Sequence, residues 1–340
     1  MKSNIPGGLI LLYHRIASLD RDPQMLCVSP ENFQRHLEIL RERLRIVPLA
    51  EIAGDVAAGR SPDGKAAITF DDGYADNVLT AAPILRRHDA PATIFATTGH
   101  TNSCNEFFWD ELDRIFLSPG ELPAQLRIWL PQRPYEIDLG PDAVYTDADA
   151  QSHRRWTVLQ KSDPTSRHRA YRELCTLLHD CTASRRRQVL EQLQAWAGMR
   201  MRRSHRMMSA QELRGLAETE GIQIGGHTVD HPRMSVEPRQ SQGSQLRENN
   251  LTLEWITGQS IRAFSYPFGT RRDFTGETMS LVKAQGYQFA CANFEGRVTA
   301  GSDLFALPRF IVRDWVAGEF REKLERRMAL PVSDGISRAA

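Results

Sequence analysis

Short apolar runs alternate with helical patterns along most of the chain, and this alternation constrains the fold more than any other feature. Each apolar run stops abruptly at polar residues, as a buried strand does where it meets a turn. Strands that alternate with helices predict a parallel α/β sheet or barrel, in which the chemistry collects at the carboxyl ends of the strands. The predicted strands cover residues 9–13, 66–70, 92–96, 221–224 and 263–266, and the predicted helices cover residues 31–44, 77–88, 210–220 and 245–257.

One segment, residues 101–205, breaks the alternation. It has a Pro-rich middle and ends in two helical stretches near residues 167–178 and 183–197. We therefore predict a discontinuous barrel formed by residues 1–100 and 206–325, a largely helical insertion formed by residues 101–205, and a C-terminal tail formed by residues 326–340.

The predicted insertion is basic. Residues 151–206 contain thirteen Arg or Lys residues against four Asp or Glu residues. Solvated helix faces are the plainer explanation of this surplus. The alternative is a surface that attracts an anionic partner, such as a lipid pyrophosphate or a membrane, so that the protein would make peripheral membrane contact through the insertion.

Over the whole chain, 43 Lys and Arg residues balance 42 Asp and Glu residues, which argues against a nucleic-acid-binding protein. The five cysteines are scattered and include no C-x-x-C pair, which fits a reducing compartment. The apolar run at residues 9–12 is too short for a signal peptide, and no stretch approaches the roughly 18–20 apolar residues of a membrane span. We expect a cytoplasmic protein that could act at the inner face of the membrane.

Two adjacent carboxylates, Asp71 and Asp72, follow the predicted strand at residues 66–70. Asp72-Gly73 alone could be an ordinary turn. Two neighbouring carboxylates are costly unless a cation or a proton offsets their charge. One carboxylate as a metal ligand and the other as a general base would remove that cost.

Two imidazoles, His227 and His231, follow the predicted strand at residues 221–224 and a Gly-Gly pair. On one helical turn this spacing would bring both side chains to the same face, where they could share a metal. An isolated H-x-x-x-H pair often only decorates a surface, but the position after a strand favours a site. One Asp and two His form the three-ligand set of an open catalytic metal centre.

Three motifs, TFDDGY at residues 69–74, HTVDHP at 227–232 and SYPFG at 265–269, occur in this order. In this respect the chain resembles the NodB-homology polysaccharide deacetylases, carbohydrate esterase family four, over residues 9–98 and 207–315. The resemblance implies a distorted (β/α)7 barrel. It further implies that Asp71 is the general base and that Asp72, His227 and His231 bind a divalent metal, with Zn²⁺ expected and Co²⁺, Ni²⁺ or Mn²⁺ as alternatives.

The chain departs from the family pattern at two places. The position of the third motif at which members generally carry an Arg, which orients the base, is Ser265; by analogy with exopolysaccharide-type members, Arg309 is the candidate replacement, although it could be a surface Arg. The C-terminal Leu-x-His that supplies the general acid is absent, because no His follows His231. Members of the exopolysaccharide type take this acid from an N-terminal motif, and His14 at the end of the first strand is the candidate here.

The remaining expectations concern the lining of the site. The backbone N–H of Phe268 is expected to help hold the oxyanion. Packing or capping roles are open alternatives for the candidate substrate-binding residues, which are Tyr74, Asn77, Tyr266, Pro267 and Trp315.

We therefore expect a metal-dependent hydrolase that removes an N-acetyl group from an amino sugar of a polysaccharide, an oligosaccharide or a lipid-linked glycan precursor. A deformylase or amidase acting on a lipid-linked amino sugar or a small cyclic amide is an alternative. A catalytically silent carbohydrate-binding domain is another, although such a domain would be expected to lose a ligand or the base.

Overall fold

The computed structural model describes residues 6–103, 105–130, 134–198, 202 and 204–329. The chain separates into two compact units. The first, the barrel unit, contains Met1–Ser18, Leu26–Ser103 and Met207–Ala340, and the second, the insertion unit, contains Leu19–Met25 and Cys104–Arg206. The sequence did not indicate that residues 19–25 would pack with the insertion unit.

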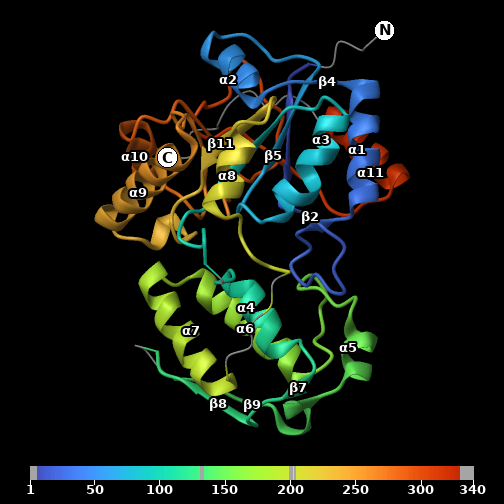
Figure 1. Ribbon diagram of the computed structural model, residues 1–340, viewed down its shortest axis with the longest axis vertical. Coiled ribbons are helices and arrows are strands. Elements are labelled where there is room, and N and C mark those ends of the chain that lie inside the picture. The colour runs from blue at the N-terminus through green and yellow to red at the C-terminus, as the bar shows by residue number, and fades with distance from the viewer. Residues whose placement is uncertain (1–5, 104, 131–133, 199–201, 203, 330–340) are drawn as a thin grey trace. The chain divides into compact units, whose positions relative to one another are not determined.

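A curled parallel sheet forms the centre of the barrel unit (Figure 1). Leu307, just before the last strand, bridges in parallel to Cys291 at the opposite edge, so this part of the chain contacts both edges of the sheet. The α/β fold predicted as a distorted (β/α)7 barrel is thereby confirmed. The strand order is β13 (Phe289–Cys291), β12 (Ala263–Ser265), β11 (Ile222–Gly226), β6 (Ala92–Ala96), β5 (Lys65–Phe70), β1 (Leu9–Tyr13) and β14 (Phe310–Ile311), with β4 (Arg45–Ile46) also paired to β5.

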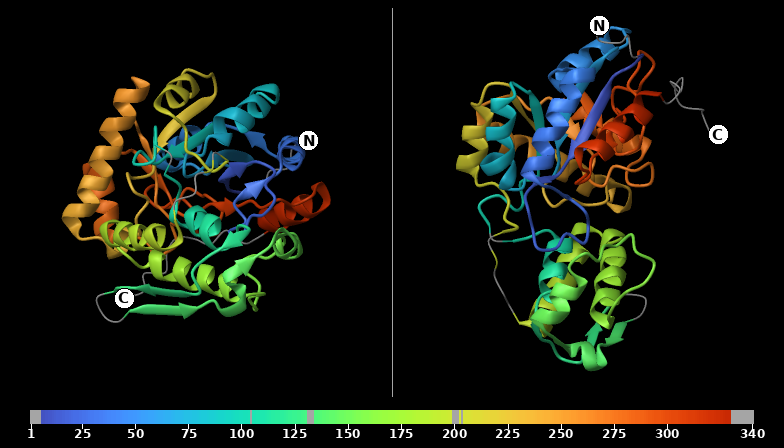
Figure 2. Two further views of the ribbon diagram at one scale, coloured as in Figure 1. Left: turned by 60° about the horizontal axis from the view of Figure 1, so that its bottom comes forward. Right: turned by 90° about the vertical axis from the view of Figure 1, so that its right-hand side faces the viewer.

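Helices surround the sheet of the barrel unit, as the two views in Figure 2 show. The first begins as its sequence predicts, because the Ser29 hydroxyl accepts a hydrogen bond from the Asn32 N–H (3.4 Å) and Pro30 occupies the first turn. The helices are α1 (Pro30–Arg43), α2 (Leu49–Ala57), α3 (Ala82–Arg87), α8 (Ala210–Ala217), α9 (Arg239–Thr257), α10 (Gly276–Ala284) and α11 (Ala317–Ala329).

Several boundaries differ from those predicted. The segment predicted as one helix at residues 77–88 begins as a π-helical stretch, η1 (Asn77–Ala81), and α9 starts well before residue 245. Helix α11 extends beyond residue 325 into the predicted tail. The strands β4, β13 and β14 were not predicted, since two or three residues are too few to show a hydrophobic period.

The two faces of the sheet carry different apolar clusters. Side chains such as Leu9 and Leu11 of β1 pack with α1, α3, α8 and α9 on the outer face. On the inner face, Ile10 clusters with Phe95 and with residues of α2. The Phe95 ring fills this space so closely that a Cβ on Gly225 would lie 2.4 Å from it, which explains the glycine in β11. The period of two along each strand therefore decides which side chains point inward.

The insertion unit contains α4 (Phe108–Phe116), α5 (Asp147–His153), α6 (Ser166–His179) and α7 (Ala183–Ala197). Two small antiparallel sheets accompany them, β7 (Gly120–Glu121) with β10 (Val144–Tyr145) and β8 (Gln125–Ile128) with β9 (Tyr135–Asp138). Part of the basic surplus is internal: Arg167 and Arg186 are buried, and Arg202 contacts Glu106 (2.8 Å) and Asp113 (2.5 Å). Among the described helices of the protein, none has the length and apolar character needed to cross a membrane.

A fully buried histidine, His36, connects α1 to α11. Its ring stacks on Phe320 (centroids 3.9 Å apart), and its Nε2 lies 2.7 Å from the carbonyl oxygen of Trp315. Burial lowers the pKa of His36 from 6.5 to about 4, and the Trp315 carbonyl only partly offsets this effect.

We predict that this histidine makes the barrel unit sensitive to acid. The unfolded chain takes up the proton near pH 6.5 and the folded chain only near pH 4, so the free energy of unfolding falls as the pH drops through this window. The loss should be on the order of 3 kcal/mol, since each pKa unit corresponds to about 1.4 kcal/mol. Urea unfolding at pH 7 and pH 4.5 should show a smaller acid loss in His36→Phe, which retains an aromatic ring. An equal loss in both proteins would contradict this assignment.

Candidate active site

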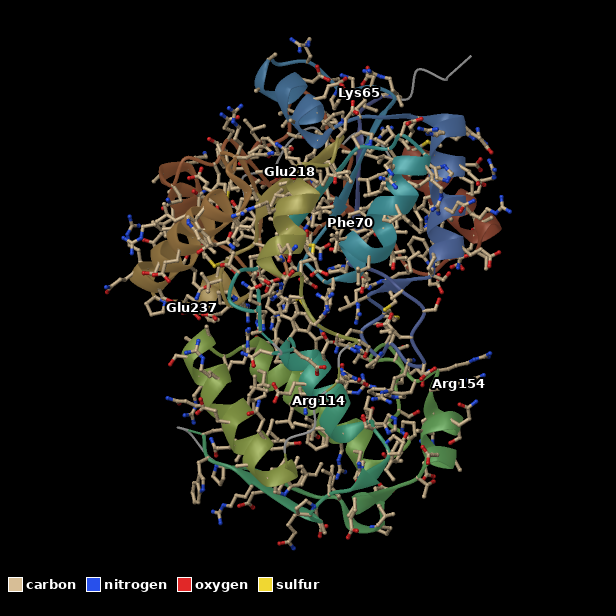
Figure 3. The ribbon with its side chains drawn as sticks, viewed as in Figure 1. Lys65, Phe70, Arg114, Arg154, Glu218 and Glu237 are labelled. Carbon is tan, nitrogen blue, oxygen red and sulfur yellow. The ribbon has the colours of Figure 1, made fainter. Side chains whose placement is uncertain are left out.

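The predicted site residues emerge at the carboxyl ends of neighbouring strands. Strand β5 runs from Lys65 to Phe70, both labelled in Figure 3, and Asp71 follows directly. Asp71 lies two residues beyond Thr69 and four beyond the inward-facing Ala67, so the period of two also directs it to the inner face. His14, His227 and Ser265 stand at the ends of β1, β11 and β12. The parallel strands of one sheet thus bring four distant parts of the sequence together.

Left-handed backbone conformations redirect the residues that follow these strands. Asp72 has φ 76°, Thr228 has φ 67° and His231 has φ 52°, a region that non-glycine residues adopt at a cost. Residues 227–232 consequently form an irregular loop, and the prediction that His227 and His231 share a helical turn is wrong. The left-handed residues cannot continue a helix, yet they bring the two imidazole rings to a centroid distance of 4.9 Å.

The strained loop is held by Asn249 of α9, which the sequence analysis did not single out. Its Oδ1 accepts a hydrogen bond from the His227 N–H (3.1 Å), and its Nδ2 donates to the carbonyl oxygens of Thr228 (2.6 Å) and Ala96 (3.0 Å). Gln245, one turn earlier, accepts from the backbone N–H groups of Val229 and Asp230. Both side chains are buried on the face of α9 that also carries Leu246 and Leu253. The signal in the sequence that could have identified these two residues is their position among apolar residues on one face of the predicted helix.

Asp72, His227 and His231 form a buried cluster whose potential ligand atoms lie within 4.8 Å of one another. Asp72 Oδ1 is 3.5 Å from His227 Nε2 and 3.4 Å from His231 Nε2. Two ligands held tetrahedrally at about 2.1 Å from one ion are themselves about 3.4 Å apart. Burial raises the pKa of Asp72, but the imidazoles of His227 and His231 outweigh this and hold it well below its usual range.

His227 has the tautomer that a metal ligand requires. Its Nδ1 lies 2.7 Å from the carbonyl oxygen of Ser265 and must donate a proton to it, because a carbonyl can only accept. The buried Nε2 then carries a lone pair, and it has no hydrogen-bond partner. A backbone carbonyl that orients a ligating His is a usual feature of metal sites. The donor set and this orphaned nitrogen both fit a divalent cation.

Asp71 is held by Arg309, which follows Leu307 and precedes β14. The guanidinium donates from NH1 to Oδ1 (2.7 Å) and from NH2 to Oδ2 (2.6 Å), a bidentate pair. The Arg309 side chain is fully buried, which excludes the alternative that it is a surface Arg. Burial raises the pKa of Asp71, but the positive charge of Arg309 outweighs this effect and lowers it below its ordinary value. Asp71 is therefore kept ionised.

Ser265 takes part in the same network. Its hydroxyl donates to Asp71 Oδ2 (3.0 Å) and accepts from Arg309 NH2 (2.8 Å). Arg309 Nε donates to the carbonyl oxygen of Ala292 (2.8 Å), so the guanidinium is fixed on both edges. The small Ser265 side chain thus leaves room on the inner face for a guanidinium that enters from another strand.

His14 leaves β1 on the inner face, in register with Ile10. Burial lowers the pKa of His14, and the charges of Asp72 and Asp71 act in the opposite direction, which places the imidazole in the field of both carboxylates. Asn77 is fully buried, and its Nδ2 donates to the carbonyl oxygen of His14 (2.8 Å).

Some of the other candidate residues lie at the site, and others are packed in the core. The Phe268 ring contacts the His231 ring edge-on (4.6 Å), and its φ of 59° turns the backbone at this point. Trp315 is partly buried against Phe310. Tyr74, Asn77 and Tyr266, which we predicted to contact substrate, are fully buried in the structure. Tyr266 stacks on Phe274 (3.9 Å) and donates its hydroxyl to the Phe305 carbonyl.

Pro267 is buried as well, and its carbonyl oxygen accepts a hydrogen bond from the Gly269 N–H (2.6 Å). The side chains of the third motif therefore build the turn that carries Phe268, because a packed ring cannot also serve as a wall for a ligand.

The Asp71–Arg309 pair yields a prediction about stability. Arg309→Met should lower the free energy of unfolding by about 3–5 kcal/mol, since it leaves a buried carboxylate without its counter-charge. In the double variant Arg309→Met/Asp71→Asn the charge is removed from both partners, and much of the loss should be recovered. Urea unfolding of wild type, both single variants and the double variant measures this coupling. Losses that simply add would show that the pair is not coupled.

Comparison with known proteins places the chain in a family. The polysaccharide deacetylase family model matches residues 58–122 and 184–290, half of the chain. The chain is 32% identical over 112 residues to YxkH of Bacillus subtilis (strain 168), a match that spans 31% of this chain and only 39% of that protein.

Two solved structures share the fold. The Streptococcus pyogenes deacetylase PplD in complex with acetate has 17% identity and a TM-score of 0.58 and covers 96% of this chain and 100% of its own. IcaB from Ammonifex degensii has 15% identity and a TM-score of 0.59, with 95% and 98% covered. At these identities the likeness concerns the fold alone. The family match confirms the resemblance seen in the sequence: the chain belongs to the polysaccharide deacetylases, hydrolases that cleave carbon–nitrogen amide bonds.

Proposed function

We propose that the protein removes the N-acetyl group from an amino sugar of a polysaccharide, an oligosaccharide or a lipid-linked glycan precursor, with a divalent metal as cofactor. The observation that carries this proposal is the adjacency of two differently held carboxylates. Asp72 faces two imidazoles in a cluster of metal-ligand type, while Asp71 is kept ionised by Arg309. A ligand and a base side by side are what amide hydrolysis by activated water needs.

Each residue then has a separate task. Asp72, His227 and His231 would hold the cation, Zn²⁺ in our proposal with Co²⁺, Ni²⁺ or Mn²⁺ as alternatives. When bound, it supplies Lewis acidity to the acyl oxygen and lowers the pKa of water. Asp71 accepts the proton of the attacking water, and Arg309 holds its carboxylate in place through two hydrogen bonds. The Phe268 N–H helps hold the oxyanion. His14 donates a proton to the leaving amine, which separates from the acyl group as a neutral product.

We predict that metal binding and chemistry can be separated by mutation. Asp72→Ala and His231→Ala should lose bound metal and activity together. Asp71→Asn should keep the metal and lose about 10²–10⁴-fold in kcat, the usual contribution of a general base. Metal content by elemental analysis and amide hydrolysis of N-acetyl-glucosamine oligomers measure both properties. His179→Gln, at a partly exposed surface site in the insertion unit, is the control. Wild-type activity in Asp71→Asn or wild-type metal content in Asp72→Ala would refute the proposal.

We also propose that the insertion unit contacts an anionic membrane surface through the loop between α5 and α6. Leu159 at this loop is 75% exposed, and the cations Arg154, Arg155 and Lys161 around it are exposed as well. Arg154 lies at the surface of the unit in Figure 3. Residues 154–161 contain no acidic residue that would oppose an anionic partner. An exposed apolar side chain among cations is a usual membrane-surface pattern.

The loop is rigidly built, which supports a role for the exposed Leu159. Arg172 of α6 donates to the carbonyl oxygens of Val158 and Gln160, on either side of Leu159. It also forms an ion pair with Asp163 (2.8 Å), so that this acid is neutralised within the loop. Trp156 is buried beneath.

Vesicle co-sedimentation tests this contact. We predict that the protein binds vesicles of phosphatidylglycerol and phosphatidylcholine and binds pure phosphatidylcholine far less, because each cation near an anionic surface contributes about 1 kcal/mol. Leu159→Asp should weaken binding at least about tenfold, since burial of a Leu side chain contributes roughly 1.5–3 kcal/mol. The matched control is Leu251→Asp, at a leucine of α9 in the barrel unit that is 56% exposed. Equal binding to both vesicle types, or by Leu159→Asp and wild type, would refute the proposal.

A further inference from the structure

The backbone around His14 is held by two consecutive residues, Asp76 and Asn77, that follow the first motif. Asp76 Oδ1 accepts a hydrogen bond from the Ile16 N–H (3.0 Å), and its Oδ2 accepts from Arg15 Nε (2.9 Å). Arg15 NH2 lies 2.9 Å from the same Oδ2. Asn77 Nδ2 donates to the carbonyl oxygen of His14 itself (2.8 Å). Four contacts thus converge on three consecutive residues, 14–16.

This part of the chain needs such support because it has left the main sheet. Strand β1 pairs with β5 only up to Tyr13. The next strand, β2 (Arg15–Ile16), pairs instead with β3 (Cys27–Val28) in a separate two-stranded sheet. His14 lies at the junction between the two sheets and belongs to neither. The peptides on either side of it each make one backbone hydrogen bond, from the Asp71 N–H to the Tyr13 carbonyl (3.0 Å) and from the Arg15 N–H to the Leu26 carbonyl (3.2 Å), and the side chains of Asp76 and Asn77 add to these.

The imidazole itself is not fixed by hydrogen bonds. Within the described part of the chain, the only hydrogen bond involving His14 beyond its own strand is the one its carbonyl accepts from Asn77. The ring orientation must then follow from the position of its backbone and from packing. A proton donor that is not itself tethered loses precision if its backbone moves, because catalytic groups act over hydrogen-bond distances.

Apart from its contacts with Arg15 and Ile16, the Asp76 side chain accepts one further hydrogen bond, from Asn77 Nδ2 to its Oδ1 (3.4 Å). Asp76 precedes the π-helical η1, but its side chain makes no capping hydrogen bond there, and its backbone is already in the right-handed helical region (φ −66°, ψ −16°). Its partner Arg15 is almost fully buried and lies over the Tyr74 ring, 4.3 Å from its centroid. The side chain of Asp76 is 12% exposed, so the ion pair is well shielded from solvent.

We propose that Asp76 is a positioning residue for the general acid: through Arg15 and Ile16 it fixes the backbone of His14, while Asn77 fixes the His14 carbonyl. Because Asp72 and Asp76 belong to one short segment, the same loop that supplies a metal-ligand candidate also aligns the acid on the neighbouring strand. This inference rests on the proposed role of His14.

A double-mutant cycle tests the proposal. Asp76→Asn keeps an oxygen acceptor for the Ile16 N–H and removes the charge that pairs with Arg15. It should lower kcat about 10–100-fold on an alkyl N-acetyl amide, a part of the roughly 10²–10⁴-fold that general acid catalysis usually contributes, and leave KM and metal content close to wild type. In a His14→Ala background the same substitution should have no further effect, since a positioning residue acts only through the group it positions.

A second substrate separates positioning from structural damage. An aryl acetate ester has a leaving group that needs no proton, so His14→Ala and Asp76→Asn should both hydrolyse it at nearly the wild-type rate. A distorted barrel would lose activity on both substrates. The matched control is Asp55→Asn in α2, which removes a carboxylate from ion pairs with Arg60 (3.0 Å) and Lys65 and should leave both activities unchanged.

The outcomes distinguish the two proposals. Full amide hydrolysis by His14→Ala would overturn the acid role of His14 and the positioning role of Asp76 together. A large loss in His14→Ala, combined with an Asp76→Asn effect that is equally large in both backgrounds or on both substrates, would overturn the positioning role alone. Arg15→Gln, which breaks the same ion pair from its other side, should reproduce the kinetics of Asp76→Asn. Wild-type kinetics in Arg15→Gln would also overturn the positioning role.

Discussion

The structure of the site depends on the burial of two adjacent carboxylates. Asp71 and Asp72 are both nearly inaccessible to water, and two neighbouring buried anions cannot persist without compensating charge. The protein compensates them separately. Asp71 receives a fixed cation, Arg309, whose positive charge lowers the pKa of the carboxyl against the effect of burial. Asp72 receives two imidazoles whose nitrogens stand at ligand-to-ligand distance from it. The difference between a tethered base and a metal-ligand cluster follows from these two kinds of compensation.

Much of the surrounding structure can be understood as support for this arrangement. Arg309 needs space on the inner face, and Ser265 provides it where a larger residue would not. His227 needs one tautomer, and the Ser265 carbonyl selects it. The left-handed residues Asp72, Thr228 and His231 cost conformational energy, which Asn249 helps to offset with hydrogen bonds to the loop. Strain located at these positions is the expected mark of a site that must hold its side chains in one arrangement.

The segment that contains the first motif also contacts the residues that follow the first strand. Asp72 belongs to the metal-ligand cluster, and Asp71 lies next to it. Asp76 and Asn77, a few residues later, bind the chain around His14. One short segment therefore touches every group assigned a part in the proposed reaction except those on the third motif. The insertion unit is organised differently, since several of its arginines serve internal contacts, while others remain at the surface, among them those around Leu159.

The sequence by itself determined the α/β class, the strands that carry the site and the residues Asp71, Asp72, His227 and His231, because hydrophobic periods and strand-end motifs are local signals. It also made Arg309 and His14 candidates, by resemblance and by the absence of any other suitable residue. Only the tertiary structure decided that Arg309 is buried against Asp71, that Tyr74, Asn77 and Tyr266 are covered, and that Asp76 binds Arg15. These facts depend on contacts between residues up to 238 positions apart, which no local pattern encodes. The two imidazoles illustrate the division: their spacing was visible in the sequence, but the left-handed loop that brings them together, and the hydrogen bonds from α9 that hold it, were not.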